Sequence, residues 1–352
     1  MITVFTPSFA DEADTNAQNL TVKEIVARLS PEQFRVVMLY EETPDPRIAR
    51  RPNTRLLRWH RRGNTVRILL HCLANVPDVY FFPREGPLDS AFLTLRRRLA
   101  LRTAIVTYVV SGGLYKPDPP RPALARNVRE ADIVFGNCRF LGKLVRERMG
   151  VEAGVRYDGI DRRFFFPAGK VAASNRKLKV LFAGSLRPYK RAEVVVRQAA
   201  RWPKIDFRIA GRGEEEQNCR KLAAALGCAN VTFVGHLSSA QLGVEMRQAD
   251  IFLLPSVVEG HPQVLGQAAA CGLPALAMNI YQPEFLVNGK TGFAVESDTE
   301  LTEKLDLLIS QPELRRFMGE AAILHSRNFD WDRITLQWQE AFEQAVAKRR
   351  RR

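Results

Sequence analysis

The sequence predicts an α/β protein made of two doubly wound, Rossmann-like domains. Three observations support this fold class: a length of 352 residues, which suits two domains; two successive runs of apolar segments alternating with amphipathic ones; and a loss of that periodicity over residues 166–177. Such alternation is typical of parallel sheets covered on both faces, with ligands in a cleft at the carboxyl ends of the strands. We expect one domain over residues 1–168, a second over 178–327, and a C-terminal helix with a basic tail over 328–352 that packs back towards the first domain.

The first run opens with a strand at residues 2–5 and a loop that continues to residue 16. Further strands of this run are expected at 34–39, 79–82, 104–110 and 132–135. Its helices are expected at 17–29, 65–74, 88–99, 121–130 and 139–149.

The second run starts after the loss of periodicity. Its strands are expected at 179–182, 206–209, 231–234, 251–254 and 275–277. Its helices are expected at 191–200, 215–226, 240–247 and 262–271, and three more close the chain at 299–308, 312–326 and 334–348.

Positive charge is concentrated in the first half of the chain. Residues 1–170 hold 28 lysines and arginines against 18 acidic residues, whereas residues 171–352 hold 25 against 20. Between Pro46 and Pro77 there are eight arginines and no acidic residue. Such a field attracts anionic partners, which include lipid headgroups, lipid-linked phosphates and nucleic acid. Alternatively, the basic face only aids solubility.

Neither export nor membrane insertion is indicated. The first residues form an apolar, strand-like run without the charged start of a signal peptide. The longest apolar stretches, 68–76 and 103–114, are shorter than the roughly 20 residues that a spanning helix needs. Five widely spaced cysteines do not suggest a disulfide or zinc framework. We expect a cytoplasmic protein, with peripheral association at the inner face of the membrane left open.

The most informative motif follows the expected strand at 251–254. It reads Leu-Pro-Ser-Val-Val-Glu-Gly-His-Pro-Gln over residues 254–263 and leads into a helix. Proline suits a first helical turn, the amide groups of a helix start bind anions, and Gly260 allows a ligand close to the backbone. We therefore expect a diphosphate near Pro262, with Glu259 placed to accept hydrogen bonds from sugar hydroxyls and His261 close enough to touch the sugar. The alternative for Glu259 is an acidic helix cap.

Two cations follow the expected strand at 179–182, in the segment that runs from Gly184 to Lys190. Cations at the carboxyl end of a strand can neutralise charge on a leaving phosphate. Arg187 and Lys190 are therefore candidates for that role, and surface charge without a role is the alternative. The turn Gly211-Arg-Gly213 after the next strand is a weaker signal, since it is a lone G-x-G.

In this order and spacing, these segments resemble retaining glycosyltransferase family 4, the glycosyl transferases group 1, whose GT-B architecture has two facing Rossmann-like domains. The resemblance covers nearly the whole second half and is loose in the first. The matching segments are 157–167, 184–190, 210–213, 231–235, 249–256, 259–260, 271–274, 288–293 and 329–331.

The resemblance implies a metal-independent, retaining sugar transfer from a nucleotide-sugar donor, with no cofactor. By this resemblance Lys190 holds the donor diphosphate and Glu259 contacts the transferred sugar, while Arg187 is a candidate for supplying a further charge. The donor-binding positions that it implies are Gly184, Ser185, Gly211, Gly213, Gly235, Gly260, His261, Pro262, Gln263, Gln267 and Asn16.

Several positions depart from the family pattern. Gln267 stands where the family has a second glutamate that binds ribose hydroxyls, and an amide can still bond a hydroxyl. Ser185 stands where an arginine is frequent, Asn16 lies in a segment that replaces a glycine-rich loop, and residues 108–111 occupy the region of a frequent histidine. We expect donor binding with altered affinity.

The basic first half would face the acceptor, which we expect to be a glycan, a lipid-linked sugar or a polysaccharide precursor. Two further functions stay open from the residues. A nucleotide-sugar 2-epimerase is disfavoured by the family spacing of Glu259 and Gln267. A nucleic-acid-binding protein on a degenerate GT-B fold is disfavoured because Trp59 is the one aromatic residue among the arginines.

Overall fold

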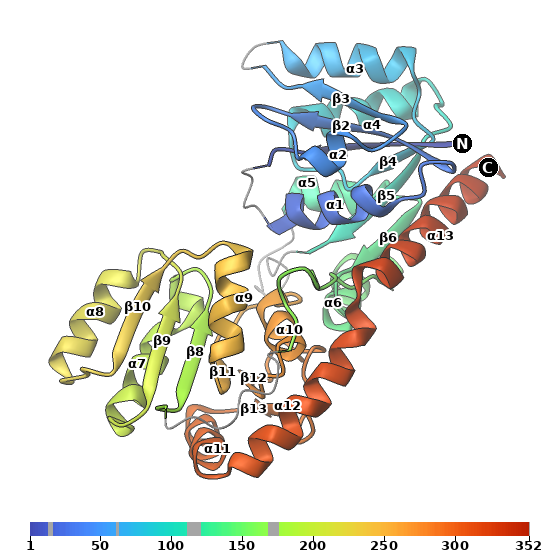
Figure 1. Ribbon diagram of the computed structural model, residues 1–352. Helices are drawn as coiled ribbons and strands as arrows, with labels where there is room; N and C mark the ends of the chain where they lie inside the picture. Colours follow the sequence, from blue (N-terminus) through green and yellow to red (C-terminus); the bar gives the residue numbers. More distant parts are fainter. Residues whose placement is uncertain (13–16, 61–62, 111–120, 168–175, 352) are drawn as a thin grey trace. The chain divides into compact units, whose positions relative to one another are not determined.

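A computed structural model divides the chain into two compact α/β units (Figure 1). The first comprises residues 1–158 and 331–352, and the second comprises residues 159–330. The structure describes residues 1–12, 17–60, 63–110, 121–167 and 176–351, so Asn16 and most of the segment 166–177 lie outside the described residues.

The first unit is built on a parallel sheet of seven strands in the order β3-β2-β1-β4-β5-β6-β7. The order reverses between β1 and β4, as in a doubly wound Rossmann sheet. The strands are β1 (Ile2–Phe9), β2 (Phe34–Tyr40), β3 (Thr54–Arg58), β4 (Val79–Phe81), β5 (Ala104–Val109), β6 (Ile133–Gly136) and β7 (Gly154–Val155).

Helices cover both faces of this sheet. On one face, Ile68 and Leu69 of α3 pack with Phe92 and Leu93 of α4 against the strands, in one apolar cluster. The helices of this unit are α1 (Ala17–Arg28), α2 (Pro46–Ala49), α3 (Asn64–Ala74), α4 (Pro87–Arg98), α5 (Pro122–Arg129), α6 (Arg139–Met149) and α13 (Trp331–Arg350).

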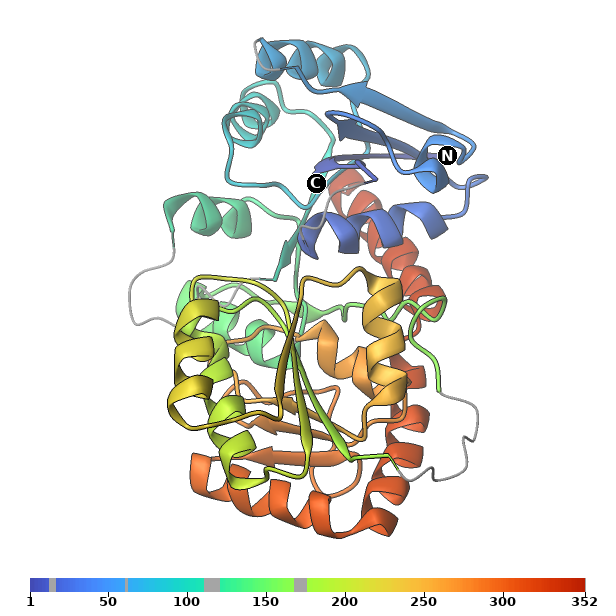
Figure 2. The same ribbon diagram turned by 60° about the vertical axis from the view of Figure 1, so that its left-hand side comes forward.

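The last helix of the chain, α13, belongs to the core of the first unit. Its Trp338 is fully buried, with its ring centroid 4.9 Å from that of Phe81 and 5.0 Å from that of Tyr108. Phe342, one turn further on, packs on Phe34 and Phe81. Both views of the ribbon show α13 running past the strands of this unit (Figure 2).

The second unit has a parallel sheet of six strands in the order β10-β9-β8-β11-β12-β13, which reverses between β8 and β11. The strands are β8 (Lys179–Ala183), β9 (Asp206–Ala210), β10 (Val231–Gly235), β11 (Ile251–Leu254), β12 (Ala275–Met278) and β13 (Gly292–Val295). The helices are α7 (Ala192–Arg201), α8 (Glu216–Ala225), α9 (Ser239–Gln248), α10 (Gln263–Ala270), α11 (Asp298–Ser310) and α12 (Pro312–Ser326), with 3-10 turns η2 (Pro188–Lys190) and η3 (Arg327–Phe329).

The predicted fold class is confirmed, and five details of the predicted elements were wrong or missing. The loop expected from Thr6 begins later, because β1 continues to Phe9 through a register shift after Thr6 that accommodates Pro7. The helix α2 and the edge strand β3 lie inside the arginine-rich stretch, where no element was expected. The short strands β7 and β13 were also missed, since β7 has two residues and β13 begins at a glycine.

Among the described residues, no helix of the structure combines the length and apolar character needed to cross a membrane.

Candidate functional site

The carboxyl edge of the second sheet holds a switch point between β8 and β11. The chain leaves β8 towards β9 on one side and returns to β11 on the other. In open α/β sheets, ligands bind in the crevice at such a reversal. The two loops that begin there are joined, because the Val257 amide donates to the Tyr189 carbonyl at 2.9 Å.

An ion pair links these two loops. Lys190 Nζ, which follows β8, lies 2.5 Å from Glu259 Oε1, which follows β11. The two side chains are only 13% and 10% exposed. Arg191, the next residue, adopts a left-handed conformation (φ 55°) that ends η2 and starts α7. Lys190 is thereby held at the sheet edge, where a partly desolvated cation interacts more strongly with an anion than it would in water.

Close backbone contacts explain the glycines of the adjacent loops. A Cβ on Gly211 (φ +139°) would lie 1.8 Å from the Gly184 carbonyl oxygen, and one on Gly213 would lie 2.3 Å from the Leu186 carbonyl oxygen. The loops after β8 and β9 are also hydrogen-bonded, since the Leu186 amide donates to Arg212 O at 2.9 Å. Gly211 and Gly213 thus set the shape of this edge.

The start of α10 faces the same edge. Its N-cap residue is Pro262, which provides no side-chain cap, so the amides of the first turn can serve a ligand. Two polar atoms nearby in sequence, Ser256 Oγ after β11 and Gln267 Oε1 in α10, are buried without a hydrogen-bond partner among the described residues. Buried polar groups normally have a partner, which a bound ligand can supply.

His261 lies beneath the loop instead of at its surface. Its ring stacks on Phe285 with centroids 3.8 Å apart, and it is 5% exposed. Gly266 makes room for this stack, because a Cβ there would lie 2.5 Å from the Phe285 ring. Burial lowers the pKa of His261 to about 3, so the imidazole is neutral near pH 7. In this position the His261 ring packs beneath the loop between β11 and α10 and helps to hold the loop in place.

The remaining candidates occupy the same edge of the sheet. Ser185 and Arg187 are exposed in the loop after β8, and Gly235 (φ +74°) ends β10, where its carbonyl accepts from the Gly211 amide at 2.7 Å. Gly260 and Gln263 flank His261 and Pro262 between β11 and α10. The described candidates therefore gather where β8, β9, β10 and β11 end, and the side chains of Lys190 and Glu259 are in direct contact there.

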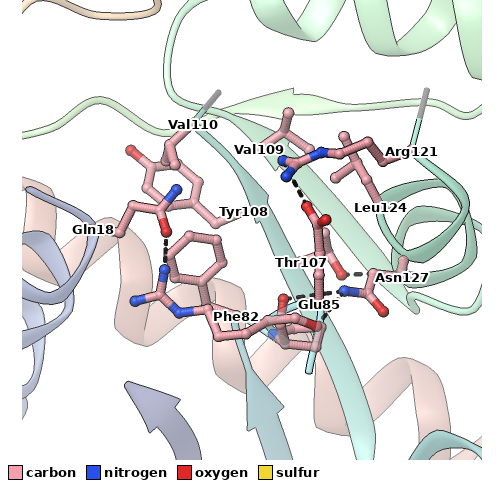
Figure 3. Close-up of a pocket in the computed structure, with 12 residues that line it drawn as sticks. Gln18, Phe82, Glu85, Thr107, Tyr108, Val109, Val110, Arg121, Leu124 and Asn127 are labelled. Atoms are coloured by element: carbon pink, nitrogen blue, oxygen red, sulfur yellow. Dashed lines mark hydrogen bonds and ion pairs between the residues drawn. The ribbon is translucent and has the colours of Figure 1, made fainter. Parts of the chain in front are cut away.

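A pocket lies in the first unit, at the carboxyl ends of β4 and β5 (Figure 3). Its volume is about 290 Å³. Gln18 of α1, Arg84 and Glu85 after β4, Tyr108 of β5 and Asn127 of α5 contribute to its wall.

Arginines provide much of the polar character of this pocket. Arg84 lies over the Phe82 ring at 4.5 Å and donates to Asn19 Oδ1 at 2.5 Å and to Ser8 Oγ at 3.1 Å. Arg84 also donates to Gln18 (Figure 3). Arg121 pairs with Glu85 at 2.8 Å. These contacts fix two guanidinium groups at the pocket wall.

Tyr108, in the region of the absent histidine, has a buried hydroxyl whose single proton can be donated to either of two acceptors, Arg156 O at 2.8 Å and Asp158 Oδ1 at 3.1 Å. Burial, followed by the charge of Asp158, raises the pKa of Tyr108 well above its usual value, so it stays protonated. Sequence reasoning missed Arg84, Glu85 and Asn127. The sequence signal for Arg84 and Glu85 was that they come shortly after the buried strand β4, which ends at Phe81.

The switch point of the second sheet thus combines a lysine ammonium group with a helix start whose amides have no side-chain cap. Helix starts with free amides attract phosphate groups, and switch points of open α/β sheets are where ligands bind. Residues 168–325, nearly the whole of the second unit, match the family model described as Glycosyl transferases group 1.

Two curated relatives are named as glycosyltransferases. The D-inositol 3-phosphate glycosyltransferase of Pseudarthrobacter chlorophenolicus is 29% identical over 258 residues, which cover 66% of this chain and 60% of the relative. An uncharacterized glycosyltransferase of Haemophilus influenzae is 32% identical over 181 residues, which cover 49% of this chain and 50% of the relative. The chain thus spans about half to three fifths of the length of these relatives.

Solved structures establish the GT-B fold. Sucrose-phosphate synthase from Thermosynechococcus elongatus has a TM-score of 0.82 at 18% identity, covering 99% of this chain and 100% of that one. The Anabaena protein HepE, solved in complex with UDP and glucose, has a TM-score of 0.77 at 16% identity, covering 98% of this chain and 100% of that one.

Proposed function

We propose that the protein is a retaining, metal-independent glycosyltransferase that takes a sugar from a nucleotide-sugar donor. The observation that carries this proposal is the shielded pair of Lys190 and Glu259 at the β8–β11 switch point, 2.5 Å apart. The family match favours this function over an epimerase or a nucleic-acid-binding protein.

In the proposed reaction, the bond between the anomeric carbon and the phosphate oxygen breaks and its electron pair stays with the nucleoside diphosphate. Lys190 and the amides at the start of α10 stabilise the charge on that leaving group. The acceptor hydroxyl forms the new bond to the anomeric carbon on the same face, and its proton passes to the departing phosphate. Glu259 holds the sugar hydroxyls, and Arg187 supplies a second positive charge from the exposed loop.

The same proposal assigns the donor's ribose to Gln267. Its buried Oε1 can accept a hydrogen bond from a ribose hydroxyl. Because the side chains supply the positive charge, we propose that no metal or other cofactor takes part, and a chelator should leave the turnover unchanged.

We propose that the acceptor, a glycan, a lipid-linked sugar or a polysaccharide precursor, is bound by the first unit. The pocket at the ends of β4 and β5 supports this assignment, because Arg84 and Arg121 suit an acceptor that carries a phosphate or carboxylate. The Pseudarthrobacter relative is named for D-inositol 3-phosphate, which is a compound of this chemistry.

We also propose that the protein is cytoplasmic and acts at the inner face of the membrane. Two basic segments could attract it there, the C-terminal tail and the arginine-rich stretch. In the tail, Lys348 Nζ donates to Asp132 O at 2.7 Å and Arg349 donates to Leu101 O at 3.1 Å. These tail cations are engaged by backbone carbonyls of the same unit, whereas Arg50, Arg55 and Arg58 are exposed and have no such side-chain contact with the described residues, so the arginine-rich stretch is the better candidate.

A thermal-shift panel of UDP-, GDP- and ADP-sugars tests donor binding. A ligand at 100 times its dissociation constant should add about 2.7 kcal/mol to the free energy of unfolding. The product's anomeric configuration, read by NMR, tests retention. The proposal fails if no nucleotide sugar stabilises the protein, and retention fails if the anomeric centre is inverted.

A further inference from the structure

Helix α3 is apolar on both of its faces. Its inner face contributes Ile68, Leu69 and Cys72 to the core. Its outer face carries Val66 and Leu70, one turn apart, which are 63% and 61% exposed. A surface helix normally places polar residues on the side that meets water, so the outer face of α3 is unusual for a surface in contact with solvent alone.

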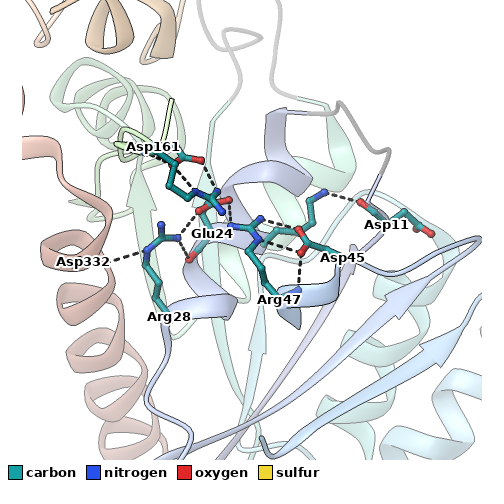
Figure 4. A network of polar contacts seen from close by, with 9 residues as sticks. Asp11, Glu24, Arg28, Asp45, Arg47, Asp161 and Asp332 are labelled. Atoms are coloured by element: carbon teal, nitrogen blue, oxygen red, sulfur yellow. Dashed lines mark hydrogen bonds and ion pairs between the residues drawn. The ribbon is translucent and has the colours of Figure 1, made fainter. Parts of the chain in front are cut away.

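The structure divides the arginine-rich stretch next to α3 into two groups. Arg47 belongs to a polar network of the fold, paired with Asp45 and Glu24 at 2.7 Å each (Figure 4). Arg51 is 7% exposed and donates to the carbonyls of Leu29 at 2.8 Å and Phe34 at 3.1 Å. These two arginines stabilise the fold.

A second group is exposed, namely Arg50, Arg55, Arg58 and Arg67. Arg67 is a residue of α3 whose guanidinium donates to the Arg58 carbonyl of β3. Arg55 of β3 is near His71 of the same helix: burial lowers the pKa of His71, and the positive charges of Arg55 and Arg67 lower it further. The outer face of α3 is therefore an apolar strip with guanidinium groups beside it.

We propose that this α3 face, defined as Val66, Arg67, Leu70 and Ala74 together with Arg55 of β3, docks onto an anionic lipid bilayer. An apolar strip flanked by cations is the pattern of helices that lie in a membrane interface, where apolar side chains enter the headgroup region and guanidinium groups bind lipid phosphates. The inference rests on the proposed function, because a lipid-linked acceptor is reached from a bilayer surface.

Neither protection of the sheet edge nor binding of a nucleic acid accounts for the whole α3 face. Arginines protect an edge strand such as β3 from pairing with other chains, but this does not explain why Val66 and Leu70 are exposed. A nucleic acid would also be drawn to the arginines, yet the outer face of α3 offers aliphatic side chains and no aromatic ring for base stacking. A bilayer surface uses both the apolar strip and the cations.

Vesicle flotation with the full chain tests the proposal. The probes are vesicles of phosphatidylcholine alone and vesicles that also contain phosphatidylglycerol. We expect binding to the anionic vesicles that weakens as salt is added. Val66→Glu with Leu70→Glu should lower the binding constant by more than about tenfold, and Arg55→Gln and Arg67→Gln by about fivefold each.

Matched controls come from the same chain. Leu336 of α13 is 59% exposed, so Leu336→Glu changes a similarly exposed apolar residue of the same unit. Arg197→Gln removes an exposed arginine from α7 of the second unit. Both controls should bind vesicles as the unchanged protein does.

The proposal is overturned if the protein floats equally with both kinds of vesicle or with neither. It is also overturned if the controls lose as much binding as the α3 variants. A third contradicting outcome is that the α3 variants lose binding to RNA but not to lipid. A nucleotide-sugar thermal shift on every variant verifies folding. It also separates the two proposals, because a chain that binds donor without anionic lipid refutes the docking surface alone. A chain that binds lipid without donor refutes the glycosyltransferase alone.

Discussion

The two units share one scaffold but differ in what lies at the switch point. In both sheets the first strand of the unit, β1 or β8, is central. The next two strands along the chain lie on one side of it, and the strand after those, β4 or β11, lies on the other side. In the second unit this edge holds the ion pair of Lys190 and Glu259 and loops in which glycine is required. In the first unit it holds Arg84 beside amide and hydroxyl oxygens and a pocket of about 290 Å³. A shared strand order thus fixes where a ligand binds, while the loops decide its chemistry.

The largest expected effect concerns the cation of the second unit. Lys190→Ala should lower the turnover number by about 10²–10³, which is the scale of losing one preorganised charge that stabilises a leaving group. Steady-state kinetics with the nucleotide sugar that gives the largest thermal shift provide the measurement. Lys221→Ala, which removes an exposed lysine from α8, should retain full turnover.

Near-normal turnover in Lys190→Ala would remove this residue from the proposed chemistry. A loss confined to KM, with kcat unchanged, would mean that Lys190 binds the donor equally in the ground state and the transition state.

The second prediction concerns the glycine that shapes the same edge. In Gly211→Ala the new Cβ would meet the Gly184 carbonyl oxygen at 1.8 Å, so the loops after β8 and β9 would have to separate. We expect a loss of about 2–4 kcal/mol in the free energy of unfolding, measured by urea denaturation. Gly227→Ala is the control, because Gly227 also has positive φ (+65°) but nothing within 4 Å of a Cβ, and should cost about 1 kcal/mol. Equal losses in the two variants would show that backbone conformation matters here and the contact does not.

The same contrast explains which parts could be predicted from the sequence. The strands β8, β11 and β12 of the second sheet are short, mostly buried runs such as Ile251–Leu254, and their apolar character predicts them directly. The edge strand β3 was missed because Arg55 and Arg58 are exposed and hide its apolar pattern. The motif around Glu259 was identifiable because its residues are adjacent in sequence. The pocket of the first unit was not, since Gln18, Arg84 and Asn127 are brought together only by the fold.

The third prediction concerns His261, which is buried beneath the loop between β11 and α10. An ordinary histidine pKa is near 6.5, and burial lowers that of His261 to about 3. Between these values the unfolded chain binds a proton that the folded chain does not, so stability is full above about pH 6.5 and falls as the pH drops towards 3. From pH 7 to pH 5 this group should account for a loss of about 2 kcal/mol in the free energy of unfolding.

His261→Phe keeps a ring for the stack on Phe285 and removes the titration. Urea denaturation at both pH values should show a smaller pH dependence in this variant than in the unchanged protein. His60→Gln, at an exposed position, should leave the dependence as it was. If His261→Phe is as sensitive to pH as the unchanged protein, the imidazole is not the buried titrating group.

The smallest effect is expected for Arg84 in the pocket of the first unit. This prediction tests whether the two units bind different ligands. If Arg84 recognises an anionic group on the acceptor, Arg84→Gln should raise the KM for that acceptor about tenfold, the worth of one charge-assisted hydrogen bond. Hydrolysis of the donor in the absence of acceptor should not change, because that reaction needs only the second unit. Inositol 3-phosphate and a lipid-linked sugar phosphate are suitable acceptors for the assay, and Arg129→Gln, at an exposed position of α5, is the control. Equal loss of transfer and hydrolysis in Arg84→Gln would mean that the residue stabilises the fold or contributes to donor binding. The proposal that this pocket binds the acceptor would then be wrong.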